Sequence, residues 1–140
     1  MTDIGDLVPL DDEMGFTSPP VASILGGDVV AVEPTLSLLA ASEKMHAAGY
    51  GILVVGTRER VEGVVSERDI LRAVATGTDL AATTVGDIES THLRWAATAS
   101  TVRDVAEEMM EDYIRHVLVR NDDGTLAGIV SMRDVLGAVM

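Results

Sequence analysis

The sequence predicts an α/β (α+β) fold built from two βαββα repeats. Residues 63–71 and residues 128–136 match at nine positions, six of them identical, which indicates an internal duplication. The same order of hydrophobic patterns precedes both segments. Each repeat has only about 55 residues and would bury little apolar surface alone, so we expect the two repeats to share one core.

The duplication extends back to the beginning of each repeat. Residues 21–24 (VASI) and residues 85–88 (VGDI) lie 64 positions apart. At the same offset the apolar residues of two predicted helices align: Leu38, Ala41 and Met45 with Val102, Val105 and Met109. One additional residue within 121–124 then changes the offset to 65. A register that holds over this length indicates two copies of one structural unit.

Each repeat opens with a strand and a helix. Residues 29–32 and 93–96 are short apolar runs of the kind that forms a strand. In the segment that follows in repeat two, apolar residues recur at helical spacing: Val102, Val105, Ala106, Met109 and Met110. Acidic residues fill the intervening positions and indicate a solvated outer face.

Two further strands and a closing helix complete each repeat. Residues 52–55 with 61–65, and residues 116–120 with 126–130, are Val-rich segments that predict paired strands. Asp123-Gly124 is a hairpin turn signal within the second pair. A closing helix is expected to start at Ser66 and at Ser131.

The repeats define the organisation of the chain. We expect an acidic N-terminal arm at residues 1–17, a first repeat at 18–75, a linker at 76–84 and a second repeat at 85–140. Residues 1–20 carry five acidic and no basic residues and end in Pro19-Pro20. This composition favours a mobile or loosely docked arm.

Composition excludes several classes of function. Ten basic and twenty-three acidic residues give a formal net charge of −13, which repels nucleic acid and anionic membrane surfaces. The chain has no cysteine, no secretory signal pattern and no apolar run of about 18 residues, so we expect a cytoplasmic protein without disulfides or thiolate chemistry. The three histidines, His46, His92 and His116, lie far apart in the sequence, and no metal site is expected.

The duplicated segment resembles the signature of a known family. Gly-Val-Val-Ser-Glu-Arg-Asp-Ile-Leu at 63–71, its second copy at 128–136, and the Met-containing helix and Val-rich strand before each resemble paired cystathionine-β-synthase (CBS) domains of the small stand-alone bacterial type. The resemblance covers residues 18–140 and implies two repeats packed about a pseudo-twofold. In that family the clefts between the repeats commonly bind adenosine-containing ligands such as AMP, ADP, ATP or S-adenosylmethionine.

The resemblance implies a role for both Ser-x-x-Asp motifs. Ser66 and Ser131 are expected to contact phosphate, and Asp69 and Asp134 to contact ribose hydroxyls. A carboxylate suits this task because it accepts hydrogen bonds from both vicinal hydroxyls at once. A helix N-terminus beside the carboxylate attracts phosphate.

The same pattern is also typical of a helix capping box. In that interpretation each side chain of the motif satisfies a backbone N–H at the start of the helix. The pattern is common in this chain, because Thr-x-x-Asp also begins at Thr76, Thr84 and Thr101, outside the expected binding positions. Both interpretations of the motif stay open at this stage.

An Arg-His pair makes the two predicted clefts chemically unequal. Arg115-His116 begins the middle strand of repeat two and resembles the pair that many family members direct at ligand phosphates. Repeat one has Gly51-Ile52 at the same positions. Arg115 is therefore expected at the phosphate end, while His116 is either a second donor or a packed strand residue.

The candidate ligand-binding residues are Ser66, Arg68, Asp69, Arg115, His116, Ser131, Arg133 and Asp134. Arg68 and Arg133 face either phosphate or solvent. Trp95 lies on a strand that the family uses to line the adenine pocket, and it either stacks on adenine, fills the cleft or packs in the core. Gly56 and Arg120 stand where the family commonly has an acid, which is a departure from its pattern.

The leading functional hypothesis is a non-enzymatic sensor that binds an adenosine-containing ligand, forms a homodimer and acts on an unidentified effector protein. No P-loop, nucleophile elbow or His-carboxylate metal spacing is present, and no cofactor is expected. The alternative is a ligand-free structural module whose motifs are only caps and whose repeats exist to dimerise. Nucleotide hydrolysis is a third hypothesis, resting on His116 alone.

Overall fold

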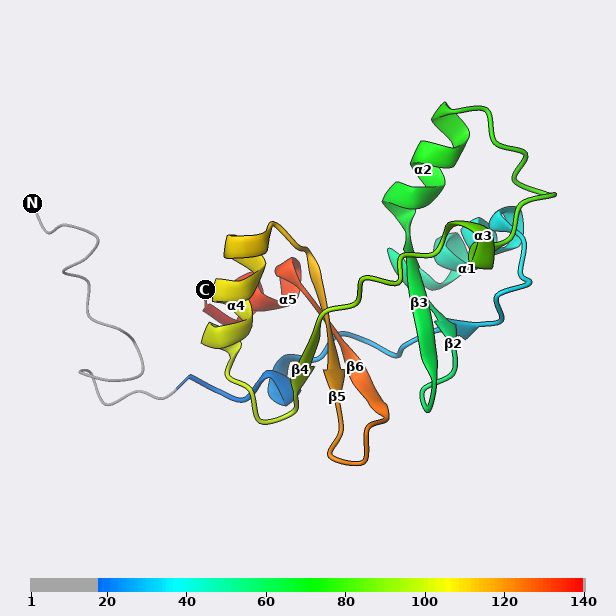
Figure 1. The fold of residues 1–140 in the computed structure, drawn as a ribbon. Coiled ribbons are helices and arrows are strands. Elements are labelled where there is room, and N and C mark those ends of the chain that lie inside the picture. The colour runs from blue at the N-terminus through cyan, green and yellow to red at the C-terminus, as the bar shows by residue number, and fades with distance from the viewer. Residues whose placement is uncertain (1–17, 140) are drawn as a thin grey trace, which may run out of the picture.

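The computed structural model describes residues 18–139, so the acidic arm expected at residues 1–17 lies outside the described residues, as does residue 140. The elements, in chain order, are η2 (Val21–Ile24), β1 (Ala31–Val32), α1 (Leu38–Ala48), β2 (Ile52–Gly56), β3 (Val61–Ser66), α2 (Glu67–Ala75), α3 (Val85–Ile88), β4 (Trp95–Ala97), α4 (Val102–Asp112), β5 (His116–Arg120), β6 (Leu126–Ser131) and α5 (Met132–Val139). Figure 1 shows the first repeat, in cyan and green, beside the second, in yellow to red.

Both repeats have the same sheet topology, which confirms the predicted βαββα order. Each contributes a three-stranded sheet, in the orders β1-β2-β3 and β4-β5-β6. In each sheet the first strand runs parallel to the middle strand, and the third runs antiparallel to it. Both hairpins have an irregular register near the end of the middle strand, at Val55/Gly56 and at Val119/Arg120. Gly56 has a φ of 110° at this bulge, a conformation that favours glycine.

The linker at residues 76–84 is docked against the start of α1. The Leu38 N–H donates to the Thr83 carbonyl at 2.8 Å, and the Leu39 N–H donates to the Leu80 carbonyl at 3.0 Å. Ser37 supplies the side-chain cap of the same helix. The linker therefore satisfies backbone donors that a helix start leaves without partners inside the helix.

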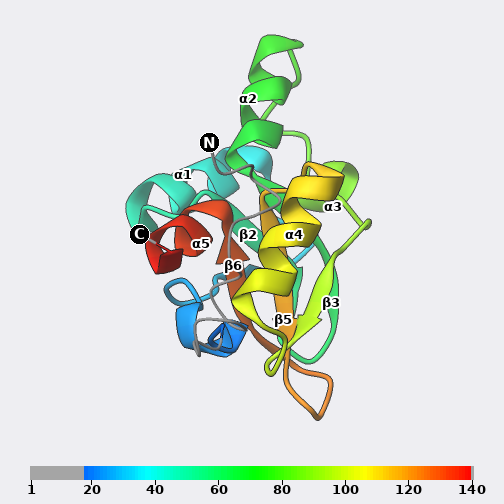
Figure 2. The ribbon, with the colours of Figure 1, turned by 90° about the vertical axis from the view of Figure 1, so that its left-hand side faces the viewer.

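The apolar core is divided into three clusters, so the single shared core expected from the sequence is only partly correct. One cluster lies between α1 and the sheet of repeat one, and a second lies between α4, α5 and the sheet of repeat two. In Figure 2, α4 and α5 lie side by side over the second sheet. The third cluster joins the two sheets, and its buried residues are Val54, Leu118, Leu126 and Ile129.

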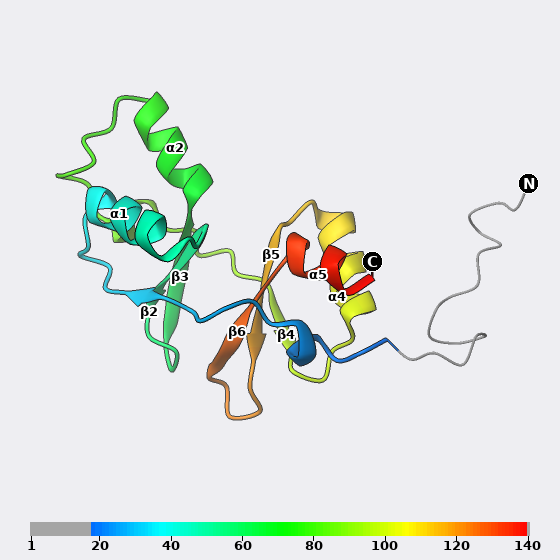
Figure 3. The same cartoon turned by 180° about the vertical axis from the view of Figure 1, so that it is seen from behind.

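Each repeat is closed by a short helical segment that the duplication assigns to the other repeat. Val21, in η2, is buried in the cluster of repeat two, while Val85, in α3, is buried in the cluster of repeat one. The Val21 N–H donates to the Ser100 carbonyl at 2.6 Å, and the Val85 N–H donates to the Leu36 carbonyl at 2.8 Å. Figure 3 shows the blue N-terminal segment lying against repeat two.

These exchanged contacts are related by the internal symmetry. Ser100 and Val85 stand 64 positions after Leu36 and Val21 in the sequence, so the two hydrogen bonds are equivalent. Further pairs follow the same rule, Gly26 N to Ile129 O at 3.1 Å and Ser90 N to Val64 O at 2.9 Å. The contacts therefore follow the pseudo-twofold arrangement expected for this fold.

The turn between β2 and β3 provides a separate link between the repeats. The Arg58 carbonyl accepts from the Leu126 N–H at 2.8 Å, and an Arg58 guanidinium nitrogen donates to the Leu126 carbonyl at 2.9 Å. Arg58 thus ties the hairpin tip of repeat one to the edge of β6.

Candidate functional site

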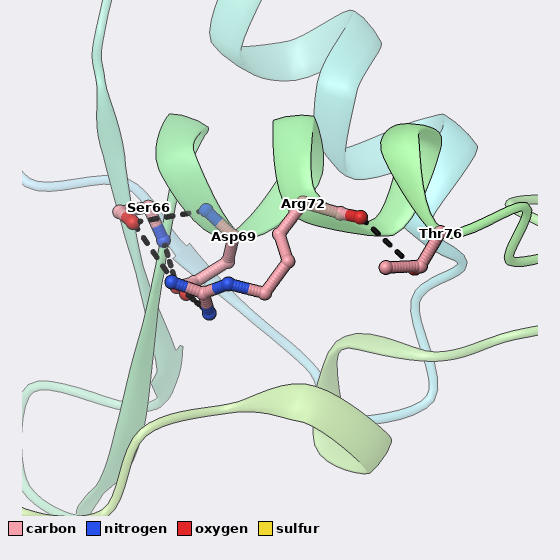
Figure 4. A network of polar contacts seen from close by, with 4 residues as sticks. All are labelled: Ser66, Asp69, Arg72 and Thr76. Carbon is pink, nitrogen blue, oxygen red and sulfur yellow. Dashed lines mark hydrogen bonds and ion pairs between the residues drawn. The ribbon is translucent and has the colours of Figure 1, made fainter.

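Both Ser-x-x-Asp motifs form capping boxes. At the start of α2, Asp69 Oδ2 accepts from the Ser66 N–H at 2.8 Å, and Ser66 Oγ accepts from the Asp69 N–H at 3.3 Å (Figure 4). At the start of α5, Asp134 Oδ2 accepts from the Ser131 N–H at 2.8 Å, and Ser131 Oγ accepts from the Asp134 N–H at 3.1 Å. The capping interpretation is therefore confirmed for both motifs.

The two aspartates differ in their second carboxylate oxygen. Asp69 Oδ1 accepts from the Arg72 guanidinium at 3.4 Å, one turn further along α2 (Figure 4). The equivalent position in α5 is Gly137, and Asp134 Oδ1 has no hydrogen-bond partner among the described residues. Capping uses only Oδ2, so Asp134 keeps an acceptor oxygen available for another group.

The motif of repeat two opens onto a cavity of about 540 Å³. Its walls come from both repeats: residues 26–29 before β1, residues 49–52 at the start of β2, Arg115 with His116 at the start of β5, and Ile129 with residues 131–134 around the start of α5. Glu67 from α2 completes the wall. The cavity is within the size range of small-molecule sites.

Five of the eight candidate residues meet in this cavity: Arg115, His116, Ser131, Arg133 and Asp134. The other three, Ser66, Arg68 and Asp69, lie outside its lining. The cavity thus gathers Arg115 and His116 with the motif of their own repeat, and the chemical inequality of the two clefts stays a prediction.

The segment before β1 approaches Asp134 closely because it contains two glycines. A Cβ at Gly26 would lie 3.2 Å from Asp134 Oδ2, and a Cβ at Gly27 would lie 3.2 Å from the Tyr50 hydroxyl oxygen. Sequence reasoning did not single out this segment, Tyr50 or Glu67. The adjacent Gly26-Gly27 was the available signal, since paired glycines often mark a close approach of the backbone.

The cavity is rich in unpaired charge. Arg115 and Arg133 make no ion pair with a described residue, and both are exposed. Two guanidinium groups without internal partners are well suited to bind an anionic group, since the planar donor grips phosphate or carboxylate through paired N–H groups.

His116 is partly buried at the edge of this charged group. Burial lowers the pKa of His116 from its ordinary value of 6.5. The charge of Asp134 opposes this shift, Arg115 adds to it, and Glu67 opposes it. The imidazole is therefore neutral at pH 7, with one ring nitrogen able to donate and the other able to accept.

Trp95 packs between the repeats and does not line the cavity. It contacts the cluster that joins the two sheets, and the Arg120 guanidinium lies 4.2 Å from the centre of its ring. Of the alternatives for Trp95, core packing is the one found in this structure. Arg120, where the family commonly has an acid, stacks on this ring in a cation–π contact.

Residues 18–139 contain neither a metal-binding cluster nor a membrane-spanning helix. No group of three or more His, Asp or Glu side chains in this range is arranged to hold a metal ion. No helix in the same range is both long and apolar enough to cross a membrane.

Comparison with known proteins identifies close structural relatives. A CBS-domain protein from Agrobacterium tumefaciens is 33% identical, with a TM-score of 0.77 over 86% of this chain and 98% of that chain. A CBS domain protein from Pyrobaculum aerophilum, solved in complex with AMP, is 32% identical, with a TM-score of 0.74 over 82% of this chain and 88% of that chain.

Sequence comparison gives the same relationship. An uncharacterized 17.7 kDa protein of Acidianus ambivalens is 30% identical over 121 residues, which are 86% of this chain and 73% of the relative. Hypoxic response protein 1 of Mycobacterium tuberculosis is 26% identical over 114 residues, 80% of this chain and 79% of the relative. The CBS domain family matches at residues 21–76 and again at 85–140. With its duplicated sheet topology and both of these matches, the chain belongs to the CBS domain family and carries a pair of CBS domains.

Proposed function

We propose that this CBS-domain pair is a non-enzymatic regulatory module that binds an adenosine-containing ligand in the cavity beside Asp134. The observation that carries the proposal is the pairing of a free Asp134 carboxylate oxygen with two unpaired guanidinium groups in one cavity. The carboxylate suits ribose hydroxyls, and Arg115 with Arg133 suits phosphate.

The relative from Pyrobaculum aerophilum supports an adenosine-containing ligand. That protein was solved with AMP, and it resembles this chain in both sequence and fold. AMP, ADP, ATP and S-adenosylmethionine are the candidates to compare. Ligand contacts would reach residues 26–29, which connect η2, docked on repeat two, to β1 of repeat one. Binding would therefore couple the positions of the two repeats, which an effector protein in the cytoplasm would then detect.

A thermal-shift screen tests the proposal. The wild-type protein is melted with AMP, ADP, ATP, cyclic dinucleotides and S-adenosylmethionine, and the same samples are assayed for turnover. A melting shift of several degrees with at least one adenosyl compound, without turnover, is the expected result. If no compound shifts the transition, the ligand-binding function is rejected. If a bound nucleotide is consumed, the non-enzymatic part is rejected.

A second candidate function is dimerisation through the helices. Large apolar side chains are exposed on all four longer helices or directly after them; the most exposed are Leu71 at 68%, Met110 at 71% and Tyr113 at 92%. Exposed apolar groups of this size favour an interface. We propose that a second copy covers them, giving a homodimer of about 30 kDa from two 14.8 kDa chains. Light scattering at micromolar concentration that gave the mass of one chain would reject the homodimer.

A further inference from the structure

Glu67 supplies the cavity with a carboxylate from the opposite repeat. It is the first residue of α2 and the only α2 residue in the cavity lining. Its N–H donates to the Gly51 carbonyl at 2.8 Å, and a Cβ at Gly51 would lie 3.2 Å from Glu67 Oε1. The carboxylate thus lies close to the start of β2, where a side chain at position 51 would be in tight contact with it.

This carboxylate has no partner within the protein. No ion pair or side-chain hydrogen bond joins Glu67 to another of residues 18–139. Glu67 and His116 both line the cavity, and the charge of Glu67 is one of those that raise the pKa of His116. The cavity therefore contains a negative group that makes no ion pair with either of its two arginines.

The duplicated motif carries no such charge in its second copy. Met132 holds the position of Glu67, and its N–H donates to the Arg115 carbonyl at 2.9 Å in the equivalent contact. The cavity thus has Glu67 over Gly51 on one side of the pseudo-twofold, and Met132 beside Arg115 on the other.

The charges of the lining are already close to balance. Two guanidinium groups, Arg115 and Arg133, face three carboxylates, Asp28, Glu67 and Asp134. Asp134 is assigned above to ribose, and Glu67 is the carboxylate that α2 brings into the lining. The carboxylates of the lining already outnumber its guanidinium groups, so each phosphate beyond the first adds negative charge without a new cation.

We propose that Glu67 is a specificity-determining residue that limits the number of phosphates the cavity accepts, so that a nucleoside monophosphate is preferred to the triphosphate. The proposal rests on the adenosyl-binding function proposed above. Repulsion from a single carboxylate in a partly solvated cavity scales with ligand charge, and its removal is worth about threefold to tenfold in affinity for each added charge.

Calorimetric titration of AMP, ADP and ATP without divalent cations tests the proposal. The proteins are the wild type, Glu67→Gln and the control Glu62→Gln, which removes an exposed carboxylate on β3 outside the cavity. Glu67→Gln is expected to raise the affinity for ATP by about tenfold or more relative to the affinity for AMP. The control should leave the ratio of the two affinities unchanged. Met132→Glu is expected to shift that ratio further toward AMP.

The outcomes separate this proposal from the function on which it rests. If AMP binds and Glu67→Gln alters all three affinities by the same factor, the selective role is overturned and the adenosyl site stands. If no nucleotide binds any of the proteins, both are overturned. The His116 pKa, followed by NMR without ligand, gives an independent readout: it should fall in Glu67→Gln, and an unchanged value would show that the carboxylate does not face the cavity, which also overturns the selective role.

Discussion

Asp69 and Asp134 occupy the same position in two copies of one motif, yet their second carboxylate oxygens have different surroundings. Arg72 contacts Asp69 Oδ1, while Gly137 leaves Asp134 Oδ1 without a described partner. Asparagine caps a helix start about as well as aspartate, so Asp69→Asn and Asp134→Asn should each cost well under about 1 kcal/mol of unfolding free energy without ligand.

The two variants should differ when ligand is present. At a ligand concentration of about one hundred times Kd, binding stabilises the wild type by about 2.7 kcal/mol, which corresponds to several degrees in Tm. Asp134→Asn should lose most of this shift, because an amide has one acceptor oxygen and no charge. Asp69→Asn, outside the cavity, should keep it. Equal ligand-induced shifts in Tm in all three proteins would show that both Ser-x-x-Asp motifs act only as helix caps.

Arg115 is expected to act on the phosphate of the ligand alone. Arg115→Ala should weaken a phosphorylated ligand by about 1.5 to 3 kcal/mol, the effect of one lost charge-assisted hydrogen bond, and leave adenosine binding almost unchanged. Arg68→Ala is the matched control, because Arg68 is an exposed arginine inside the other motif and outside the cavity. If adenosine and AMP weaken equally, Arg115 has a structural role instead.

His116 should make stability depend on pH near neutrality. Burial lowers its pKa in the folded protein below the ordinary value of 6.5, so the unfolded chain binds the proton more readily. The unfolding free energy should therefore fall as pH decreases through 6.5 toward the lower folded pKa. Denaturant titrations at pH 7.5 and 5.5 test this against His116→Gln, in which the pH-dependent loss should be smaller. An identical loss in both proteins would assign it to other groups.

At the residue scale, the sequence predicted unequal clefts from Arg115-His116, but it did not distinguish the two aspartates of the Ser-x-x-Asp motifs. Both Ser-x-x-Asp motifs were equivalent candidates because their letters are the same. Their difference depends on Arg72, one helical turn away, and on Gly26-Gly27, more than one hundred positions from Asp134 in the sequence. The approach of Gly26 to Asp134 arises only when the repeats pack together, so local spacing does not contain it. The Arg72 contact is an i,i+3 pair within α2, and the aligned repeats, with Gly137 at the equivalent position, carried that signal.

Among the elements, the end of α4 departs from its counterpart. Helix α1 ends at Gly49 with a φ of 74°, the left-handed cap that glycine favours, whereas α4 ends at Tyr113 with a φ of 56°. A bulky residue in this conformation costs about 1 kcal/mol or more relative to glycine. Tyr113 is also 92% exposed, so burial of its side chain within this chain does not offset the conformational free energy.

Tyr113→Gly should therefore separate fold stability from assembly. We expect this variant to gain about 1 kcal/mol in unfolding free energy when measured on the monomer at low protein concentration. The proposed dimer should become weaker, because an aromatic side chain is lost from the exposed apolar surface. Sedimentation at several concentrations and denaturant titration measure the two effects. A variant with unchanged dimer affinity would remove Tyr113 from the proposed interface.

The long elements were predicted closely and the short ones were not. The middle and third strands of each repeat differ from their predicted bounds by one residue or none, because short Val-rich segments joined by a turn are a strong signal. The first strands are shorter than predicted and shifted toward their ends, at Ala31–Val32 and Trp95–Ala97. The short helices η2 and α3 have four residues each and were recognised only as repeated letters. One turn has no amphipathic period from which to predict it.

Across the whole molecule, the exchanged segments make the stability of each repeat depend on residues outside its own sheet. Val21 and Val85 are fully buried in opposite clusters. Val21→Ala and Val85→Ala should each cost about 2 kcal/mol or more, from lost burial and the cavity left behind. Amide hydrogen exchange should show reduced protection mainly in α4 for Val21→Ala, and mainly in α1 for Val85→Ala. The reverse pattern would contradict the exchange.

Because each short helical segment packs on the other repeat, the repeat boundaries drawn from sequence similarity differ from the boundaries of the two packed units. The alignment places residues 21–24 at the head of repeat one and residues 85–88 at the head of repeat two. In space, α3 continues directly from repeat one and closes it, so residues 27–90 form a continuous unit. The second unit needs residues 18–26 from the other end of the chain. Self-similarity identifies the copies, while only packing shows where each copy is completed.

This reciprocal closure has a consequence for the ancestry of the fold. A polypeptide with one repeat, beginning at the equivalent of Val21, would have a leading helical turn with no place on its own sheet. Two such polypeptides would complete each other by trading that turn, as domain-swapped partners do. Gene duplication with a nine-residue connector, residues 76–84, would then convert an obligate pair of chains into one chain and keep the exchanged contacts.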